Sequence, residues 1–546
     1  MEPNLINRID LSEIQLHHDW WRYLNKARLR VLFVTDSRFT DTNSVYEYMQ
    51  GKTLGCTKFS VKRALYGYGG GNVDIENSPG ANEPHYSNFK FNSTKPGGGR
   101  ILDDFDVMFI FAVSSSDPAN FEDDELSALH EWMNAGHGVF ATGDHSVLGQ
   151  RMGSRIPRVG TMRKWTNADG VPPGGFGDMD RIDTNQPDPA VPGQVAGTSS
   201  IPNSAQGDHI PQPINWIAQS KMRVGPFQEV HYPHEILCHP SLGPINVMPD
   251  HPHEGECFNP AVINLNAPVR FTTTVANTDE YPEVDGHRER PRIIATGENS
   301  SDYMLDKGPV NPYTFNMISV YDGYKANVGR VVVDSTWHHW YGMNIDGLIA
   351  AGGDNWEKIG RYFLNLAKYL APKGVYRDRC YFDIIDAQFA YPFNEEFMPM
   401  VEPLSLLEAG RIFRETLTIR WGKCGVLKFI REHICDLKPW LCRLLEEELI
   451  PDIDPFDGRG PSPVCLTCPP PDLLIDALLG GVIKSTTPIR EGLQSKFEGG
   501  RTRLRSVQAK KIEKLVLEGM ELGLEEFQAQ LKSDLNRTKK AWLSNR

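Results

Sequence analysis

The sequence predicts an α/β protein, and three observations lead to that prediction. Short, β-rich apolar runs alternate with amphipathic helical stretches over roughly the first 370 of the 546 residues. Polar residues follow several of these runs directly, as expected of strands that end at one edge of a parallel sheet. Hydrophobic residues make up 40% of the chain and charged residues 23%, which is typical of a globular protein.

The first part of the chain alternates strand, helix and strand. Residues 29–35 form a β-rich run, a helix is expected from about 44 to 66, and a second strand is expected at 106–113. Residues 121–135 have the acidic first turn and glycine stop of an amphipathic helix, and the apolar strand 138–142 follows. This order favours parallel strands joined by crossover helices. We therefore expect a flavodoxin-like, mostly parallel sheet with helices on both faces.

The alternation is interrupted and then resumes. From about 150 to 265 the chain is rich in proline and glycine, which predicts a long loop-rich insertion packed over the sheet. Further strands are expected at 269–275, 291–296, 315–320 and 329–334. A helix at about 354–370 follows, and Pro372 is expected to end the domain.

The remaining residues predict helices. The expected division is an α/β domain over 1–372, a helical segment over 373–450, a linker over 451–473 and a C-terminal helical region over 474–546. Apolar residues recur at helical spacing near the end of the chain. We expect this region to mediate the assembly of the chain into a homo-oligomer.

Charge and composition limit the partners and the compartment. The net charge of -13 makes binding to nucleic acid unlikely to be the function, because phosphates repel an acidic surface. The polar start of the chain resembles no signal peptide, and no run of 18 apolar residues predicts a membrane span. Nine scattered cysteines do not suggest a disulfide framework. We expect a cytoplasmic protein with a small-molecule substrate.

Polar side chains at the strand ends are the first candidates for a site. Ligands bind beyond the carboxyl ends of the strands in an open parallel sheet, so these residues are expected to share one crevice. They are Asp36, Ser114, Asp144, His145, Asp334, His338 and His339. Asp36, Ser114 and Trp337 are expected to contact the substrate. Arg158 lies in a basic stretch after the third strand, and it is expected either to neutralise an anionic group of the substrate or to pair with the acidic surface.

The insertion adds a dense group of imidazoles and carboxylates. His251, His253, Glu254 and Glu256 fall within seven residues, and Pro252 stiffens the turn between the histidines. Such ligands suit zinc, iron or manganese.

The expected metal ligands are His145, His251, His253 and His338. Adjacent residues of a strand face opposite sides, so His338 is preferred over His339. Asp144, Glu254 and Glu256 are the expected catalytic carboxylates, which would take a proton from metal-bound water. The alternative is that these histidines occupy surface turns without a metal.

No nucleotide cofactor is expected. The glycines at 69–71 and 97–99 are not followed by Lys-Ser/Thr before a helix, as a phosphate-binding loop requires.

Two segments resemble the class I glutamine-amidotransferase-like superfamily, and within it the trehalose-utilisation-like branch. They are residues 106–149, with Ala135-Gly136-His137-Gly138 and Gly143-Asp144-His145, and the Gly329-Arg330-Val331 strand with its following histidine. The resemblance implies a flavodoxin-like fold and a link to sugar metabolism, without a settled reaction. Amidotransferases use a cysteine in Gly-x-Cys-x-Gly, whereas this chain has Thr142 to Ser146 without cysteine there.

Three functions remain open. The first is a metal-dependent hydrolase acting on a small polar, sugar- or amide-containing substrate. The second is a non-catalytic ligand-binding or scaffold protein with a degenerate amidotransferase-like domain. The third is a serine hydrolase using Ser146 or Ser114, although no Gly-x-Ser-x-Gly elbow supports it.

Overall fold

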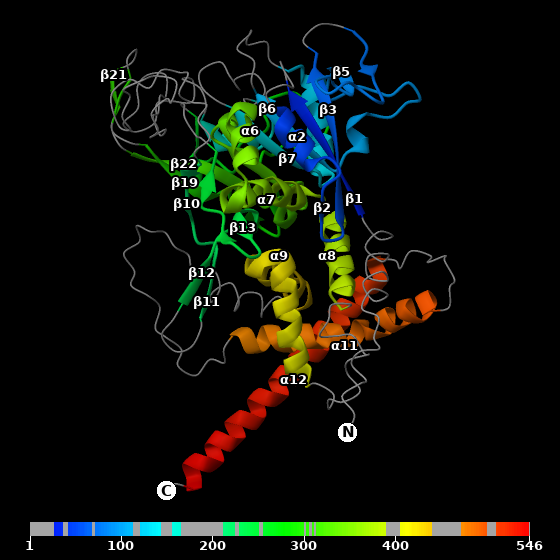
Figure 1. Ribbon diagram of the computed structural model, residues 1–546, viewed down its shortest axis with the longest axis vertical. Helices are drawn as coiled ribbons and strands as arrows, with labels where there is room; N and C mark the ends of the chain where they lie inside the picture. Colours follow the sequence, from blue (N-terminus) through cyan, green and yellow to red (C-terminus); the bar gives the residue numbers. More distant parts are fainter. Residues whose placement is uncertain are drawn as a thin grey trace.

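The computed structural model shows a large sheet covered by helices, with a helical region beneath it (Figure 1). It describes residues 27–35, 42–67, 71–112, 121–143, 155–164, 211–223, 229–249, 255–299, 302–304, 308–310, 313–388, 405–438, 471–498 and 509–544. The structural statements below concern these residues.

The central sheet contains eleven described strands. Their spatial order is β10 (Asn215–Trp216), β19 (Arg292–Asn299), β22 (Tyr313–Tyr321), β23 (Val331–Asp334), β7 (Gly138–Gly143), β6 (Val107–Ala112), β1 (Ala27–Thr35), β3 (Thr57–Tyr66), β5 (Tyr86–Phe89) and β4 (Asp74–Ile75), with β2 (Thr53–Leu54) paired to β3. The six strands from β23 to β5 run parallel. Antiparallel strands extend the sheet at both sides. The predicted α/β class is confirmed.

One expected helix is mostly a strand. Of the helix predicted at about 44–66, only α2 (Asn43–Met49) is helical, and Thr57–Tyr66 form β3. Burial in β3 alternates along most of its length, with Phe59 and Val61 buried and Lys58 exposed. That period of two is the signature of a strand, and it decides against a helix.

The strand expected at 269–275 is also wrong, although the other predicted strands form. The backbone N–H groups of Thr272 and Thr274 donate to Asp123 and Ser127 of α3 at 2.9 and 3.2 Å. Side chains of a helix thus take the hydrogen bonds that a neighbouring strand would have taken.

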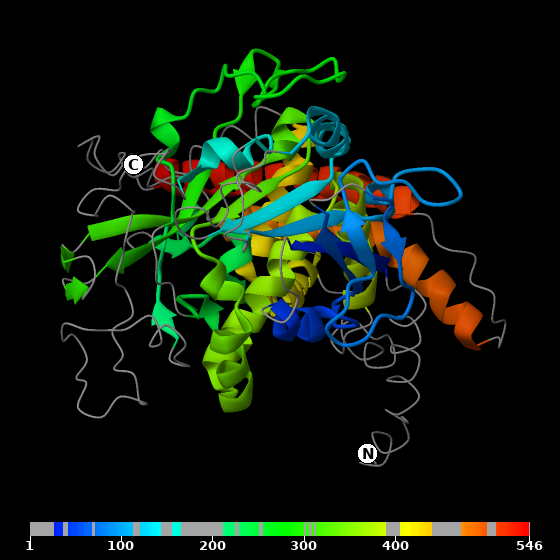
Figure 2. The ribbon, with the colours of Figure 1, turned by 90° about the horizontal axis from the view of Figure 1, so that it is seen from above.

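Helices cover both faces of the sheet (Figure 2). The helix α3 (Asp123–Asn134) packs on one face, where its Leu129 and Met133 share a core with Val139 and Val333. The helices α2, α6 (Gly342–Ala351) and α7 (Gly353–Leu370) pack on the other face. The helix predicted at about 354–370 is therefore confirmed.

The described parts of the insertion form short pieces around the sheet. They include α5 (Val159–Met162), the 3-10 helix η6 (Glu235–Leu237) and the ladders β8–β16 (Arg163–Lys164, Glu256–Cys257), β9–β15 (Gln212–Pro213, Val247–Met248), β11–β12 (Ser220–Arg223, Glu229–Tyr232) and β13–β14 (Cys238–His239, Gly243–Pro244). Two further ladders follow it, β17–β18 (Glu283–Val284, His287–Arg288) and β20–β21 (Asp302–Met304, Gly308–Val310).

Four helices form the lower part of the molecule: α8 (Lys373–Ala387), α9 (Leu406–Leu437), α11 (Pro471–Glu498) and α12 (Ala509–Ser544). Glycines allow α11 and α12 to approach closely, since a Cβ at Gly523 would lie 2.2 Å from the Ala477 carbonyl oxygen. Apolar side chains form one continuous core from the sheet through α7 to α12. No described helix combines the length and the apolar character that crossing a membrane requires.

A chain of buried charges joins the sheet to this helical region. Arg330, immediately before β23, is fully buried, and its guanidinium lies 2.8 Å from Asp322 and 3.1 Å from Glu432 of α9. Its Cζ also lies 3.4 Å from the Tyr324 ring centroid and 4.2 Å from that of Tyr369 of α7.

The charge chain continues through α9 into the insertion. Lys428 of α9 pairs with both Glu432 and Glu235 of η6. Burial alone would raise the pKa of Asp322, but the Arg330 guanidinium outweighs burial and holds that pKa well below its ordinary value. Five alternating charges thus connect the sheet, α9 and the insertion.

We predict that Arg330→Gln lowers the free energy of unfolding by about 3–5 kcal/mol, because it leaves buried carboxylates without their cation. Urea denaturation followed by circular dichroism measures this loss. Arg100→Gln is the control: Arg100 also pairs with two carboxylates, but at the surface, so it should cost about 1 kcal/mol or less. Equal losses in the two variants would contradict this account.

Candidate functional site

The carboxyl ends of four parallel strands lie in register at one edge of the sheet. Asp334 of β23 pairs with Thr142 of β7, Thr142 with Phe111 of β6, and Phe111 with Thr35 of β1. The four strands therefore end side by side. The expectation that these strand ends converge is confirmed for the backbone of the strands themselves.

Asp334 is the one charged residue among these four in-register residues at the strand ends. Its carboxylate is fully buried, and Oδ2 accepts hydrogen bonds from His339 Nδ1 at 2.8 Å and from the Tyr362 hydroxyl at 3.3 Å. A carboxylate cannot donate, so His339 carries its proton on Nδ1 when neutral, and Nε2 is then the basic atom of the ring. Burial, followed by the nearby Asp334 charge, raises the pKa of Tyr362 well above its ordinary value. Tyr362 therefore stays a hydrogen-bond donor.

The two histidines after β23 lie on a 3-10 helix, η9 (Trp337–Trp340), and not on a strand continuation. Thr336 begins this helix, since its hydroxyl accepts from the His338 backbone N–H at 3.2 Å. His338 is buried, and its Nδ1 lies 3.2 Å from the Asn344 side-chain oxygen. The strand-based reason for preferring His338 to His339 was therefore wrong, because the helical turn buries both rings against different partners.

Several oxygens near Asp334 are buried without a hydrogen-bond partner. They are Asp334 Oδ1, Thr142 Oγ1 and Ser335 Oγ, and Thr35 Oγ1 is similarly placed at the end of β1. Thr142, Phe111 and Thr35 share the α7 face with Asp334, because β-strand side chains alternate and these residues are in register. Unpaired buried oxygens are uncommon in folded proteins, so this group is a candidate binding site.

Most of the predicted site residues lie outside the described residues. These are Asp36, Ser114, Asp144, His145, His251, His253 and Glu254. For Trp337 the structure describes the backbone but not the side chain. His338 is the one predicted ligand whose side chain is placed at this edge.

The remaining two predicted residues lie elsewhere. Glu256 of β16 is buried and accepts from Lys164 Nζ at 3.1 Å across the β8–β16 ladder. Arg158 precedes α5 on the α3 face, with its guanidinium 5.8 Å from the Tyr321 ring. Tyr321 pairs with Val331 at the start of β23, which is the end opposite Asp334. Among the described residues, neither has a hydrogen bond or ion pair with Asp334 or His339, although Cys257, next to Glu256, donates from Sγ to the Val333 carbonyl at 3.5 Å.

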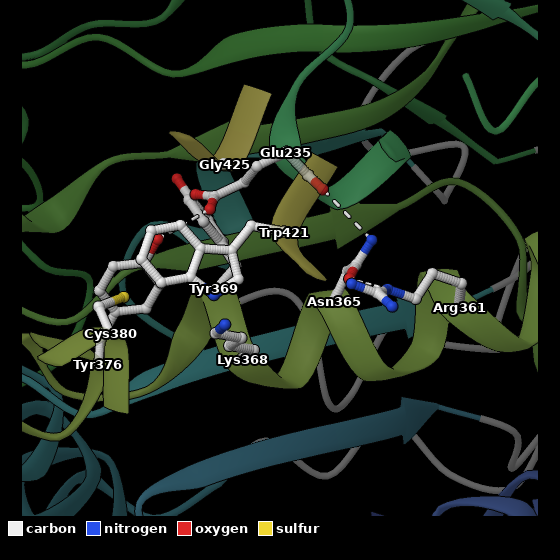
Figure 3. A pocket seen from close by; sticks show the side chains of 9 residues that line it. All are labelled: Glu235, Arg361, Asn365, Lys368, Tyr369, Tyr376, Cys380, Trp421 and Gly425. Atoms are coloured by element: carbon white, nitrogen blue, oxygen red, sulfur yellow. Dashed lines mark hydrogen bonds between the residues drawn. The ribbon is translucent and has the colours of Figure 1, made fainter. Parts of the chain in front are cut away.

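A separate cavity of about 30 Å³ lies where α7, α8, α9 and η6 meet (Figure 3). Asn365 of α7 spans it, accepting from Arg361 Nε at 2.8 Å and donating to the carbonyl of Glu235 at 3.3 Å. Burial raises the pKa of the Cys380 thiol in its wall to about 12, so this cysteine stays protonated. The volume suits one or two water molecules rather than a substrate, and we assign this cavity to the packing of the helical region.

Within the described part of the chain, no three His, Cys, Asp or Glu side chains are grouped so that they could hold a metal ion. Comparison with known proteins finds no matching family model and no matching curated relative. The geometry at the strand ends is therefore the main guide to the function.

The sequence predicts Asp334 and His339 in one crevice but does not predict that they pair, and it does not point to Tyr362. His339 follows Asp334 by five residues, a spacing that a strand end followed by a 3-10 turn can close. Tyr362 lies 28 residues further along, and only the packing of α7 on the sheet brings it to Asp334. No local pattern indicates Tyr362.

Proposed function

We propose that this protein is a metal-dependent hydrolase whose site lies at the carboxyl ends of β7 and β23. The observation that supports it best is Asp334. One carboxylate oxygen is held by His339 and Tyr362, and the other is buried without a partner at a strand end where the hydroxyl-bearing Thr142 faces the same side of the sheet. A divalent cation is the natural partner for such an oxygen, since carboxylates and hydroxyls suit magnesium and manganese, and imidazoles extend the choice to zinc and iron.

The sequence supplies the other ligands in this proposal. Asp144 and His145 follow β7 directly, next to the strand that ends in Asp334. A bound divalent metal would supply an acidified water as the nucleophile. His339, oriented through its Nδ1–H by Asp334, is the proposed base that takes the water's proton. The substrate class remains the one proposed from sequence, a small polar molecule containing a sugar or an amide.

The strand order supports the flavodoxin-like part of the proposal. Five parallel strands remain when the short strands β2, β4 and β5 and the antiparallel strands are left out. They lie side by side as β3, β1, β6, β7 and β23, which is the order 2-1-3-4-5 when they are numbered along the chain. That is the order of doubly wound flavodoxin-like sheets, which bind ligands beyond the carboxyl ends of their strands. The resemblance to amidotransferase-like proteins agrees with this order and remains part of the proposal.

The scaffold alternative is favoured by one observation. The C-terminal part of α12 projects from the other described elements (Figure 1). Ala477 of α11 lies opposite Gly523, so the start of α11 at Pro471 falls near residue 529, and α12 continues roughly 20 Å further.

The partner we propose for this projecting part is a second copy of the chain. Leu524 and Phe527 are buried, and Leu531, half-buried, continues their row at helical spacing. Glu525 and Glu526 are exposed before Leu531, and Lys532 and Arg537 are exposed after it. An antiparallel pair of α12 helices would set these opposite charges against each other.

The hydrolase proposal predicts that the purified protein binds about one equivalent of a divalent metal and that Asp334→Asn weakens binding about tenfold or more. Manganese titration followed by electron paramagnetic resonance measures the affinity. The control is Asp346→Asn, an exposed carboxylate of α6 that bonds Ser44. The same variants are assayed for hydrolysis of small amides and glycosides. The proposal fails if the wild type binds no metal, or if Asp334→Asn binds it as tightly as the control.

The assembly proposal predicts that the wild type is a dimer by light scattering and that Leu531→Lys yields monomers, because it places a charge in the apolar row. Gln528→Lys, an exposed position on α12, is the control and should remain dimeric. A monomeric wild type would refute this proposal without bearing on the hydrolase.

A further inference from the structure

Arg158 is a buried cation with an unused hydrogen-bonding edge. Its side chain is fully buried, and its Nη1 donates to the backbone carbonyl of Glu280 at 3.3 Å. Its Nε and Nη2 have no hydrogen-bond partner. A guanidinium that is buried and partly unpaired destabilises the folded protein, so a ligand that accepts hydrogen bonds from Nε and Nη2 would be favoured there.

The Nε and Nη2 atoms, which are unpaired in Arg158, bind carboxylates in two other arginines of this protein. Arg30 binds Asp106 through Nε at 3.2 Å and Nη2 at 2.7 Å. Arg414 binds Asp476 through the same two nitrogens, at 2.6 and 3.3 Å. In both pairs the planar edge meets two oxygens of one group, the bidentate geometry that guanidinium favours. In Arg158 the same two nitrogens have no carboxylate partner.

Further unpaired groups surround Arg158. The Tyr321 hydroxyl is buried without a partner, and the guanidinium lies 5.8 Å from its ring. Burial and the Arg158 charge lower the pKa of His130 to about 4, so this ring is neutral. His130 Nε2 faces the amide nitrogen of Asn134 and must accept, so the unpaired Nδ1 carries the proton. Two more donors thus lie near the guanidinium.

Glu280 is the acidic group beside this site. Its Oε2 accepts from the Arg158 backbone N–H, and its Oε1 has no hydrogen-bond partner and lies 3.9 Å from Arg270 Nε. Burial raises the pKa of Glu280 to about 7, so it cancels only part of the Arg158 charge near neutral pH. The backbone of Arg158 is also left-handed, with φ of 68°, a conformation that a non-glycine residue adopts at a cost.

We propose that Arg158 holds the oxyanion of a small ligand, a phosphate or carboxylate group, through its Nε and Nη2, in a buried site on the α3 face of the sheet. This site lies on the opposite face from Asp334, by the other end of β23. It is independent of the proposed hydrolase centre, and the two proposals can fail separately.

Thermal unfolding in inorganic phosphate, with ionic strength held constant by sodium chloride, tests the proposal. Phosphate at 10–20 mM should raise the melting temperature of the wild type by roughly 1–2 °C, because it binds the folded state alone. Arg158→Gln should show no rise. Arg155→Gln is the control: Arg155 lies three residues away and pairs with Asp123 and the Phe121 carbonyl, so the rise should persist.

Parallel titrations with acetate and with sulfate identify the oxyanion. A rise with acetate alone assigns the site to a carboxylate, and a rise with phosphate and sulfate assigns it to a phosphate group. If Arg158→Gln does not fold, Arg158→Lys takes its place, since lysine keeps the charge but lacks the two-nitrogen edge and should lose most of the rise. The proposal is overturned if none of the three anions shifts the wild type, or if the Arg158 variant responds as the wild type does.

Discussion

The buried guanidinium of Arg330 is the constraint on which the arrangement of the sheet and the helices depends. It meets carboxylates from the turn before β23 and from α9, and aromatic rings from the 3-10 helix Gly323–Ala326 and from α7. Gly329, the residue before Arg330, allows the backbone to pass close to His137, because a Cβ at this position would lie 1.8 Å from the His137 carbonyl oxygen. The start of β23 is thereby fixed against the α3–β7 turn on one side and against the helical region on the other.

From that fixed start, the position of Asp334 follows by simple geometry. Side chains alternate along β23, so Val332 and Asp334 face α7 while Val331 and Val333 face α3. Helix α7 supports both ends of the strand: Tyr369 lies over Arg330, and Tyr362, two turns earlier on the same helix face, donates to Asp334. The interaction that attaches the helical region therefore also orients the carboxylate at the candidate site.

The sequence predicted the parts of the fold in which one local pattern dominates. The runs at 29–35, 106–113 and 138–142 are mostly apolar because most of both faces of these strands is buried, and they form β1, β6 and β7. The predicted helix is wrong at 57–66, where burial alternates as in a strand, and the predicted strand is wrong at 269–275, where helix side chains replace a partner strand. The Asp334–His339 pair was within reach of local reasoning, whereas Tyr362 and the free edge of Arg158 depend on tertiary packing.

Arg158 and Asp334 are among the buried charged residues of the described chain that keep hydrogen-bonding atoms without a partner. The buried guanidinium of Arg330 meets two carboxylates, whereas Nε and Nη2 of Arg158 and Oδ1 of Asp334 have no hydrogen-bond partner. Arg158 and Asp334 are opposite in charge and lie on opposite faces of the sheet near opposite ends of β23, so they cannot pair with each other. Burial makes each of these unpaired groups unfavourable alone. A cation near Asp334 and an anion on Arg158 would remove both costs, which is why these two places, rather than the small cavity between the helices, are where bound ligands are to be sought.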